Sequence, residues 1–218
     1  MNNIIGLIVS ILYIALIIVS AKAFENAGKE GSRKFIHIML SNWWIIAIVF
    51  FDNPWCAALL PAAFVVINYL SYKKDIIDVM ERDVDDENKN SLGTVYYAIS
   101  LLVLALITFG PLNNPYIGLV GIIVMGYGDG FAAVVGKAVK SKEYRFIDNK
   151  KTIAGTFTMF MISLIIMLGF FYYYESGLWI IKGIAVALLA TVAETVSLKG
   201  TDNLTIPLVT SLLAAILV

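Results

Sequence analysis

Three carboxylates stand inside or beside stretches of the sequence that are otherwise almost free of charge. Asp129 lies in the glycine-rich run 126–130, Glu194 follows an apolar run, and Asp202 directly precedes Asn203. Ionisable side chains within apolar segments of membrane length are costly, so they mark candidate functional sites. Carboxylate oxygens are also the ligands that Mg²⁺ prefers in proteins. We therefore expect Asp129, Glu194 and Asp202 to hold Mg²⁺, and the metal ion in turn to hold phosphate.

Two structural interpretations of the same carboxylates stay open. Asp129 could cap a helix beside a glycine hinge, as aspartate commonly does at helix starts. The three carboxylates could also form structural ion pairs with nearby bases, for which the sequence offers Arg33, Lys34 and Lys199. Exposed pairs of that kind contribute little to stability.

A second group of residues has the chemistry that phosphate binding needs. Lys150, Lys151 and Thr152 lie at the start of a long apolar stretch, and Gly155 allows the backbone to come close to a ligand. Compact positive charge, hydroxyl groups and amide N–H groups are the donors that hold phosphates. The spacing of a Walker A loop is absent. The alternative is that the two lysines only anchor the chain at the membrane surface.

A third group lies nearer the N-terminus. Arg33 and His37 are four residues apart and share one face of a helix, with Lys34 beside them. His37 is the only histidine, and it could be a structural hydrogen-bonding residue or part of the chemistry. Thr94 adds a neutral polar group at the start of an apolar run. With one cysteine, Cys56, the chain has neither an intrachain disulfide nor a His/Cys set for zinc.

The elements that must position these residues are membrane-spanning helices. The 218 residues are 60% hydrophobic and 15% charged, and the apolar residues fall into continuous blocks close to the roughly 20 residues that cross a bilayer as helix. This pattern excludes a soluble domain, a nucleic-acid-binding module and an outer-membrane barrel. It predicts an all-α, polytopic membrane helix bundle with about eight spans in a single domain over 1–218. The spans are expected near 4–21, 36–51, 55–70, 94–109, 116–139, 153–174, 178–195 and 204–218.

The fifth span is expected to be broken. Its run 126–130 contains three glycines and a carboxylate, which make a poor continuous helix, so we expect two half-helices. The second of them would offer an anion-binding N-terminus, with Gly126, Gly128 and Gly130 supplying backbone N–H groups. Gly128, Ala132 and Gly136 recur every four residues and form a small-residue ridge against which another helix can pack closely.

The basic residues orient the bundle. All of the 16 Lys and Arg residues except Lys182 fall on one side of the eight-span arrangement. By the positive-inside rule, loops 22–35, 72–93, 140–152 and 196–203 are cytoplasmic. We thus expect an integral protein of the cell membrane with its active site facing the cytoplasm. Loop 72–93 is expected to hold a short amphipathic stretch on the membrane surface, followed by a solvated acidic cluster at 83–87.

Taken together, the polar motifs resemble those of the CTP-dependent lipid kinases. This family includes the phytol, farnesol and dolichol kinases and the CTP-dependent diacylglycerol kinase. The resemblance covers about residues 30–210, and its specificity comes from the order of the motifs. The matching motifs are Arg33-Lys34-x-x-His37, Leu92-Gly93-Thr94-x-Tyr96, Gly128-Asp129-Gly130-x-Ala132-Ala133-x-x-Gly136, Lys151-Thr152-x-x-Gly155-Thr156, and Glu194 followed by Asp202-Asn203-Leu204-Thr205-Ile206-Pro207.

The resemblance implies a membrane kinase that phosphorylates a lipid alcohol, a prenol or diacylglycerol, with CTP or another nucleoside triphosphate and Mg²⁺. It implies no nucleic-acid partner. Asp129, Glu194 and Asp202 would hold Mg²⁺, and Asp129 or His37 would accept the hydroxyl proton. Lys151 would act at the reacting phosphate. The triphosphate and the attacking hydroxyl would be held or oriented by Arg33, Lys34, Thr94, the backbone of Gly126, Gly128 and Gly130, Lys150, Lys151, Thr152, Gly155 and Asn203.

Two other functions stay open. The CDP-diacylglycerol synthases look like relatives, but their C-terminal signature is absent from this sequence, and 202–207 is similar to the polyprenol kinase branch. A phosphatidate cytidylyltransferase is therefore the first alternative. An interrupted fifth helix with a buried carboxylate would also suit a small-solute or ion transporter. Against it, no inverted repeat is visible and the polar residues gather at one end of the spans.

Overall fold

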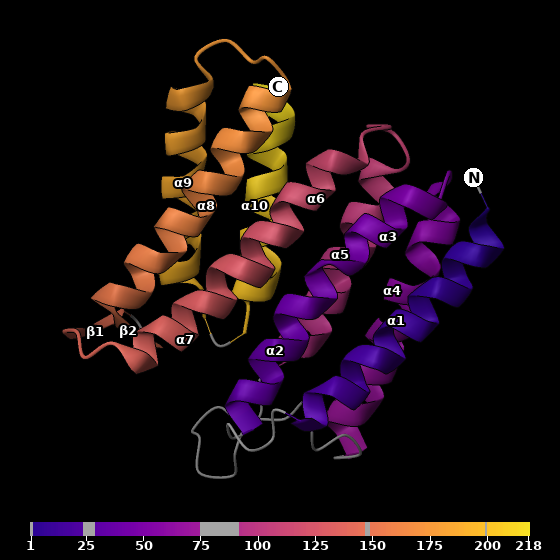
Figure 1. Ribbon diagram of the computed structural model, residues 1–218, viewed down its shortest axis with the longest axis horizontal. Coiled ribbons are helices and arrows are strands. Elements are labelled where there is room, and N and C mark those ends of the chain that lie inside the picture. The colour runs from indigo at the N-terminus through magenta and orange to yellow at the C-terminus, as the bar shows by residue number, and fades with distance from the viewer. Residues whose placement is uncertain (1, 24–28, 75–91, 147–148, 199) are drawn as a thin grey trace. The chain divides into compact units, whose positions relative to one another are not determined.

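In the computed structural model, residues 2–23, 29–74, 92–146, 149–198 and 200–218 are described. Within these ranges the chain is almost entirely helical, with one pair of short strands (Figure 1). The residues cluster into two compact units, Met1–Tyr116 and Ile117–Val218, each with its own packed helices. The single domain expected from the sequence stays a prediction.

The first unit is built from apolar helices around buried aromatic side chains. Its helices are α1 (Asn3–Ala23), α2 (Lys29–Ser41), α3 (Trp43–Phe50), α4 (Pro54–Lys74) and α5 (Gly93–Thr108). Helix α1 packs on α2 and α3, and α4 packs on α5. Trp44 is fully buried, and its indole Nε1 donates a hydrogen bond to the carbonyl oxygen of Pro115 at 2.9 Å. A buried indole usually has such an acceptor, and this contact holds α3 in the unit.

The second unit contains the glycine-rich run and most of the candidate site. Its elements are α6 (Pro115–Ile123) from Ile117 onward, the π-helical turn η3 (Val124–Asp129), α7 (Gly130–Ala138), β1 (Glu143–Phe146), β2 (Asn149–Thr152), α8 (Ile153–Tyr173), α9 (Trp179–Val196) and α10 (Asp202–Leu217). Helix α8 packs against η3, α7 and α9, and α10 packs against α9 and η3. The fully buried Ile122, Met125, Met159, Val186 and Ile206 form its apolar interior.

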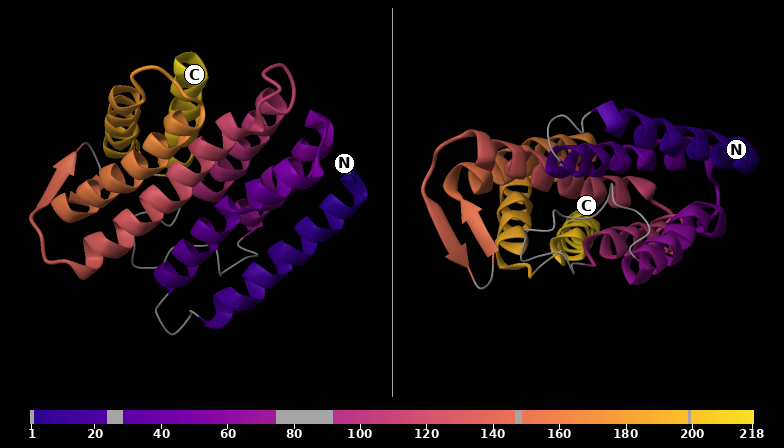
Figure 2. Two further views of the ribbon diagram at one scale, coloured as in Figure 1. Left: turned by 45° about the horizontal axis from the view of Figure 1, so that its top comes forward. Right: turned by 90° about the horizontal axis from the view of Figure 1, so that it is seen from below.

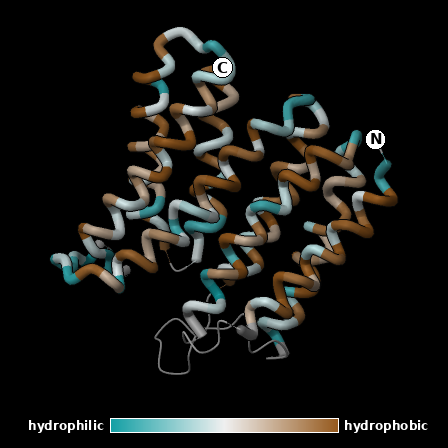
Figure 3. The backbone as a smooth tube through the Cα atoms, in the orientation of Figure 1, coloured by the Kyte–Doolittle hydropathy of each residue, from teal (hydrophilic) through white to brown (hydrophobic). Residues whose placement is uncertain are grey.

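The helices confirm the membrane bundle predicted from hydropathy. Among the described residues, six helical stretches are long and apolar enough to cross a membrane, and α5 and α10 are shorter apolar helices. Each of the eight expected spans coincides with one of these stretches. Figure 3 shows hydrophobic residues along the helices and hydrophilic residues gathered at the β1–β2 hairpin. The amphipathic stretch and acidic cluster expected in loop 72–93 fall mostly on 75–91, outside the described residues.

The interruption predicted at 126–130 is present, but its form differs from the prediction. The backbone does not separate into two half-helices. It passes from α6 through the π-helical turn into α7, and the Gly130 N–H donates to the carbonyl oxygens of Gly126 and Tyr127. Asp129 and Gly130 both keep right-handed helical dihedral angles. The prediction of a second half-helix with a free N-terminus is therefore wrong, because a wider turn accommodates the glycines without loss of hydrogen bonds.

The polar segment between the fifth and sixth spans forms a hairpin that the sequence did not predict. Strand β1 pairs antiparallel with β2, with Tyr144 opposite Lys151 and Arg145 opposite Lys150. Figure 2 shows the two strands side by side at the adjoining ends of α7 and α8. The hairpin therefore gives a defined geometry to the segment that carries Lys150, Lys151 and Thr152.

Lys182, the basic residue that departs from the charge asymmetry, has a structural role. Its ammonium donates hydrogen bonds to the Ser176 hydroxyl and, at 2.6 Å, to the carbonyl oxygen of Leu217 at the end of α10. The last carbonyl groups of a helix lack partners within the helix, and a cation is favourable there. Lys182 therefore caps α10 and ties it to the start of α9.

Close packing of α6 against α10 predicts that Gly121→Ala destabilises the second unit. A Cβ atom at Gly121 would lie 2.5 Å from the Pro207 carbonyl oxygen, and the backbone there is further tied by a 2.9 Å hydrogen bond from Ser211 Oγ to the Ile117 carbonyl oxygen. Such overpacking typically costs about 1–3 kcal/mol. The expected result is a lower midpoint of thermal unfolding in detergent.

The matched control for this prediction is Gly169→Ala in α8. A Cβ atom there meets no heavy atom of the described residues within 4 Å, so the substitution adds only helix propensity, worth up to about 1 kcal/mol. Gly169→Ala should leave the unfolding midpoint unchanged or raise it. Equal midpoints for the two variants would contradict the close approach of α6 to α10.

Candidate active site

Asp129 is held inside the second unit by the π-helical turn. It is the last residue of η3 and only 6% of its surface is exposed. π-Helical turns of this kind widen a helix by one residue and are frequent at functional sites. The local structure thus places a carboxylate among apolar helices, where an ionised group must have charged or polar partners.

The small-residue ridge brings α7 and α8 into backbone contact, as the sequence predicts. A Cβ atom at Gly136 would lie 2.7 Å from Thr152 Oγ1, and one at Gly155 would lie 2.9 Å from the Ala132 carbonyl oxygen. At Gly128 the nearest atom would be the sulfur of Met159, at 2.5 Å. Since larger side chains would force the helices apart, these small residues fix the position of the start of α8 relative to Asp129.

The hairpin is fastened to the start of α8 by four contacts. Thr152 is the N-cap of α8, and its Oγ1 accepts a hydrogen bond from the Gly155 N–H at 3.0 Å. Ser141 Oγ accepts from the Ala154 N–H at 3.1 Å, and the Tyr144 hydroxyl contacts that of Thr156. The Ile153 N–H donates to the carbonyl oxygen of Lys142. Lys151 is therefore carried on a short, well-fixed strand.

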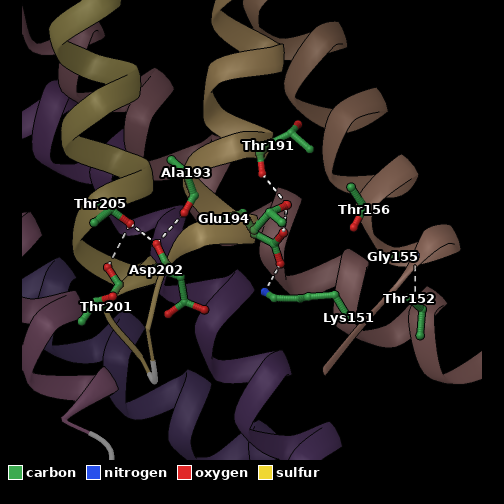
Figure 4. Close-up of polar contacts among 12 residues, drawn as sticks. Lys151, Thr152, Gly155, Thr156, Thr191, Ala193, Glu194, Thr201, Asp202 and Thr205 are labelled. Atoms are coloured by element: carbon green, nitrogen blue, oxygen red, sulfur yellow. Dashed lines mark hydrogen bonds and ion pairs between the residues drawn. The ribbon is translucent and has the colours of Figure 1, made fainter. Parts of the chain in front are cut away.

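Lys151 forms a buried ion pair with Glu194. Its ammonium donates a hydrogen bond to Glu194 Oε1, and the two side chains are 16% and 4% exposed (Figure 4). Burial lowers the pKa of Lys151, but the attraction of Glu194, Asp129 and Asp202 raises the pKa by more, to above its ordinary value of 10.5. On the alkaline side, the pair therefore keeps its stabilising effect until the pH rises through this raised pKa.

The turn between α9 and α10 places Asp202 beside this pair. The Ser197 hydroxyl contacts the Ala193 carbonyl oxygen and the Thr205 hydroxyl, which joins the end of α9 to the start of α10. Asp202 stands in the first turn of α10, where a negative charge is favoured by the helix dipole. Figure 4 shows it next to Lys151 and Glu194, and its charge acts on that of Lys151. Asn203 follows and is buried.

Three carboxylates and one ammonium thus share one electrostatic neighbourhood. The charges of Asp129 and Asp202 each act on Glu194 as well as on Lys151. The four ionised side chains together therefore carry an excess of negative charge. No three His, Cys, Asp or Glu side chains of the described residues lie close enough to hold a metal ion among them. Mg²⁺ that binds together with a nucleotide needs only one or two protein carboxylates. The residues therefore fit Mg²⁺ bound with phosphates better than a metal ion enclosed by side chains.

The two lysines predicted to bind phosphate differ in their surroundings. Lys150 and Lys151 are consecutive on β2, so their side chains leave opposite faces of the hairpin. Lys151 turns to Glu194, whereas Lys150 is exposed and stands opposite Arg145. Lys199, one of the bases proposed above for structural ion pairs, lies outside the described residues. The structure identifies Lys151 as the ion-pair partner of Glu194.

The other candidate residues belong to the first unit, and some of them meet there. His37 on α2 contacts the ring of Tyr97 on α5 edge to face, with centroids 4.8 Å apart. The Tyr97 hydroxyl donates to the His37 carbonyl oxygen at 3.2 Å. Asn68 on α4 donates to the Thr94 carbonyl oxygen at 3.0 Å. Arg33 is partly exposed and Lys34 is buried. The roles expected for Arg33, Lys34, His37 and Thr94 stay predictions.

Two residues of these arrangements were not found by sequence reasoning. Tyr144 fastens the hairpin, and no periodic pattern marks its strand. Tyr97 joins His37 on α2 to α5, although the adjacent Tyr96 was the one matched to the family motif. Tyr97 could have been found from its position three residues after Thr94, since residues three apart share a helix face.

Comparison with known proteins gives a consistent result. The chain is 30% identical over 212 residues to a phytol kinase of Synechocystis sp., covering 93% of this chain and 87% of that protein. It is 29% identical to a probable chloroplastic phytol kinase of Triticum aestivum and 26% identical to phytol kinase 1 of Arabidopsis thaliana. These alignments cover 85% and 88% of this chain and 67% and 70% of the plant proteins. No family model and no solved structure matches the chain.

Proposed function

This chain belongs to the phytol kinase family, and we propose that it is a membrane kinase that transfers the terminal phosphoryl group of CTP to a prenol. The observation that carries the proposal is the group of Asp129, Glu194 and Asp202 around Lys151, in which Asp129 and Glu194 are buried. Phosphoryl transfer depends mainly on positioning and on neutralisation of the phosphate charges. This group supplies acidic oxygens for a cation and an ammonium for a phosphate.

The division of roles follows from the charges. Asp129 and Asp202 would hold Mg²⁺, with Glu194 as the fixed partner of Lys151. When bound, Mg²⁺ would neutralise the negative charge of the triphosphate. Lys151 is the buried cation that can contact the transferred phosphoryl group, and the exposed Lys150 can contact the outer phosphates. Thr152 and Asn203, at the starts of α8 and α10, provide hydroxyl and amide groups that orient phosphate oxygens.

The proposed reaction balances as a simple transfer. The hydroxyl oxygen of the prenol forms a bond to the γ-phosphorus of CTP, and the bond from that phosphorus to the β–γ bridging oxygen breaks. The products are prenyl phosphate, CDP and one proton. Asp129 and His37 are the two candidates for the group that accepts this proton. The alkyl chain of the prenol stays among the apolar helices throughout.

The function is tested with purified protein in detergent. Phytol, farnesol and diacylglycerol are offered in turn, each with CTP, ATP, GTP or UTP and Mg²⁺, and the lipid products are identified by mass spectrometry. We expect a prenyl monophosphate with CTP as the preferred donor. Absence of a phosphorylated alcohol from every combination would overturn the proposal.

We further propose that the site faces the cytoplasm, on the basis of the basic residues. A cysteine introduced at Lys140, in a Cys56→Ala background, should resist an impermeant thiol reagent in right-side-out vesicles. Lys140 is exposed in the polar segment before β1, so the side chain itself is no obstacle to labelling.

The matched position is Leu112, an exposed residue in the turn after α5 on the opposite side of the predicted arrangement. A cysteine there should be labelled rapidly in the same vesicles. Labelling at Lys140→Cys together with protection at Leu112→Cys would reverse the orientation.

A further inference from the structure

Ser163, in the middle of α8, differs from most buried hydroxyl groups of the described residues. Hydroxyl groups inside helices commonly donate to the carbonyl oxygen four residues earlier. Thr108, Thr158 and Thr191 do so here, each at 2.8 Å. Ser163 is fully buried, and its Oγ has no hydrogen-bond partner among the described residues. A buried polar group without a partner is costly and calls for a functional explanation.

The position of Ser163 supplies a candidate explanation. A Cβ atom at Gly128 would lie 3.6 Å from Ser163 Oγ, so the hydroxyl lies against the π-helical turn immediately before Asp129. Ser163 is ten residues from the start of α8, and Asp129 is nine residues from the end of α7. At a rise of 1.5 Å per residue, both lie about 14–15 Å inside their helices. The hydroxyl and the carboxylate are therefore at similar depth.

The side chains around Ser163 are suited to an alkyl chain. Met159 and Met167 lie four residues before and after it on α8, and both are fully buried. Met125 on η3 is also fully buried. Methionine is unbranched and flexible, so it can move to admit an apolar chain of irregular shape. Around one hydroxyl group, the unit thus places several adaptable apolar side chains.

Resting on the function proposed above, we propose that Ser163 binds the hydroxyl group of the prenol acceptor. Glu194 and Asp202 stand at helix ends, and Lys151 stands on the strand that leads into α8, where a nucleotide arrives from water. Ser163 and the methionines stand among the apolar helices, where a prenol arrives from the lipid. Asp129 lies level with Ser163. Ser163 therefore positions the acceptor oxygen and takes no part in proton transfer.

The test compares Ser163→Ala with wild type in steady-state kinetics. Loss of one hydrogen bond to the acceptor should raise the KM for phytol on the order of 10-fold. The KM for CTP should stay unchanged, and the unfolding midpoint of the unliganded protein should stay the same or rise, because an unpartnered buried hydroxyl group is removed. Without nucleotide, phytol should raise the unfolding midpoint of wild type more than that of Ser163→Ala. The saturated hydrocarbon that lacks the hydroxyl group should inhibit both proteins equally.

Ser10→Ala is the matched control. Ser10 is also fully buried without a hydrogen-bond partner in the described part of the chain, but it belongs to α1 in the first unit. This variant should keep the wild-type KM for phytol. An unchanged KM for phytol in Ser163→Ala, or a fall in kcat alone, would overturn the role of Ser163 while wild type phosphorylates phytol. A wild type that phosphorylates none of the alcohols would instead overturn the proposed function.

Discussion

Asp129→Asn is expected to lower kcat for prenol phosphorylation on the order of 10²-fold or more. The substitution keeps the size and hydrogen-bonding capacity of the side chain but removes the charge that a Mg²⁺–nucleotide complex needs. Preorganised charges that stabilise a transition state are commonly worth this much in rate. Asp129 is 6% exposed, and an ionised carboxylate is costly at that depth. We therefore expect the unfolding midpoint in detergent to stay the same or to rise.

The control for this prediction is Asp52→Asn. Asp52 is exposed in the short turn between α3 and α4, where it accepts a 2.8 Å hydrogen bond from Asn3. The substitution Asp52→Asn should leave kcat unchanged. Rates are compared at saturating Mg²⁺ and CTP, so that weakened binding is not mistaken for lost catalysis. Near-wild-type turnover of Asp129→Asn under these conditions would remove Asp129 from the mechanism.

Lys151→Met is expected to abolish activity and also to destabilise the second unit by about 3–5 kcal/mol. The substitution leaves Glu194 buried at 4% side-chain exposure without its cation, and breaking one side of a buried ion pair has a cost of this size. Glu194→Gln should destabilise the unit less, because Asp129 and Asp202 still attract the ammonium of Lys151. Thermal unfolding and activity of each variant measure the two effects.

The double variant Lys151→Met/Glu194→Gln separates stability from function. It removes both charges, and buried ion pairs can often be replaced by uncharged groups at little cost. Its unfolding midpoint should therefore return most of the way to that of wild type, while its activity stays lost. Additive destabilisation in the double variant would show that the two residues do not act as a pair.

The helices could be predicted from the sequence because the membrane sets their length and composition. Continuous apolar blocks gave all eight spans, since each must cover a hydrocarbon layer about 30 Å thick. The start of the second span was placed at 36, whereas α2 begins at Lys29. Its first turns are polar and carry no hydropathy signal. The step at Asn42 between α2 and α3 was missed because apolar residues stand on both sides of it, so the hydropathy of the span is not interrupted.

Backbone detail at the site was harder to predict. The run 126–130 correctly marked an irregular turn, but glycines do not specify whether a helix breaks or widens. The choice depends on backbone hydrogen bonds, such as those from the Gly130 N–H to the carbonyl oxygens of Gly126 and Tyr127. The side chains of the run do not determine these bonds. The hairpin was missed because its strands have only four residues each and are held by contacts to α8.

Pairings across the fold were only partly accessible. An ionisable side chain within an apolar helix is costly, and Glu194 was singled out on that ground. Its partner is 43 residues away in sequence, on a strand that was not predicted. Sequence spacing alone offered Arg33, Lys34 and Lys199 equally well. Only the packing of α7, α8 and α9 selects Lys151.

The central claim is that the chain transfers the γ-phosphoryl group of CTP to a prenol, and isotopic labelling tests it most directly. Purified protein receives phytol with CTP labelled with ³²P at either the γ- or the α-phosphate. We expect γ-label in phytyl phosphate and α-label in released CDP. Transfer of α-label to the lipid together with release of pyrophosphate would contradict the account and identify a cytidylyltransferase.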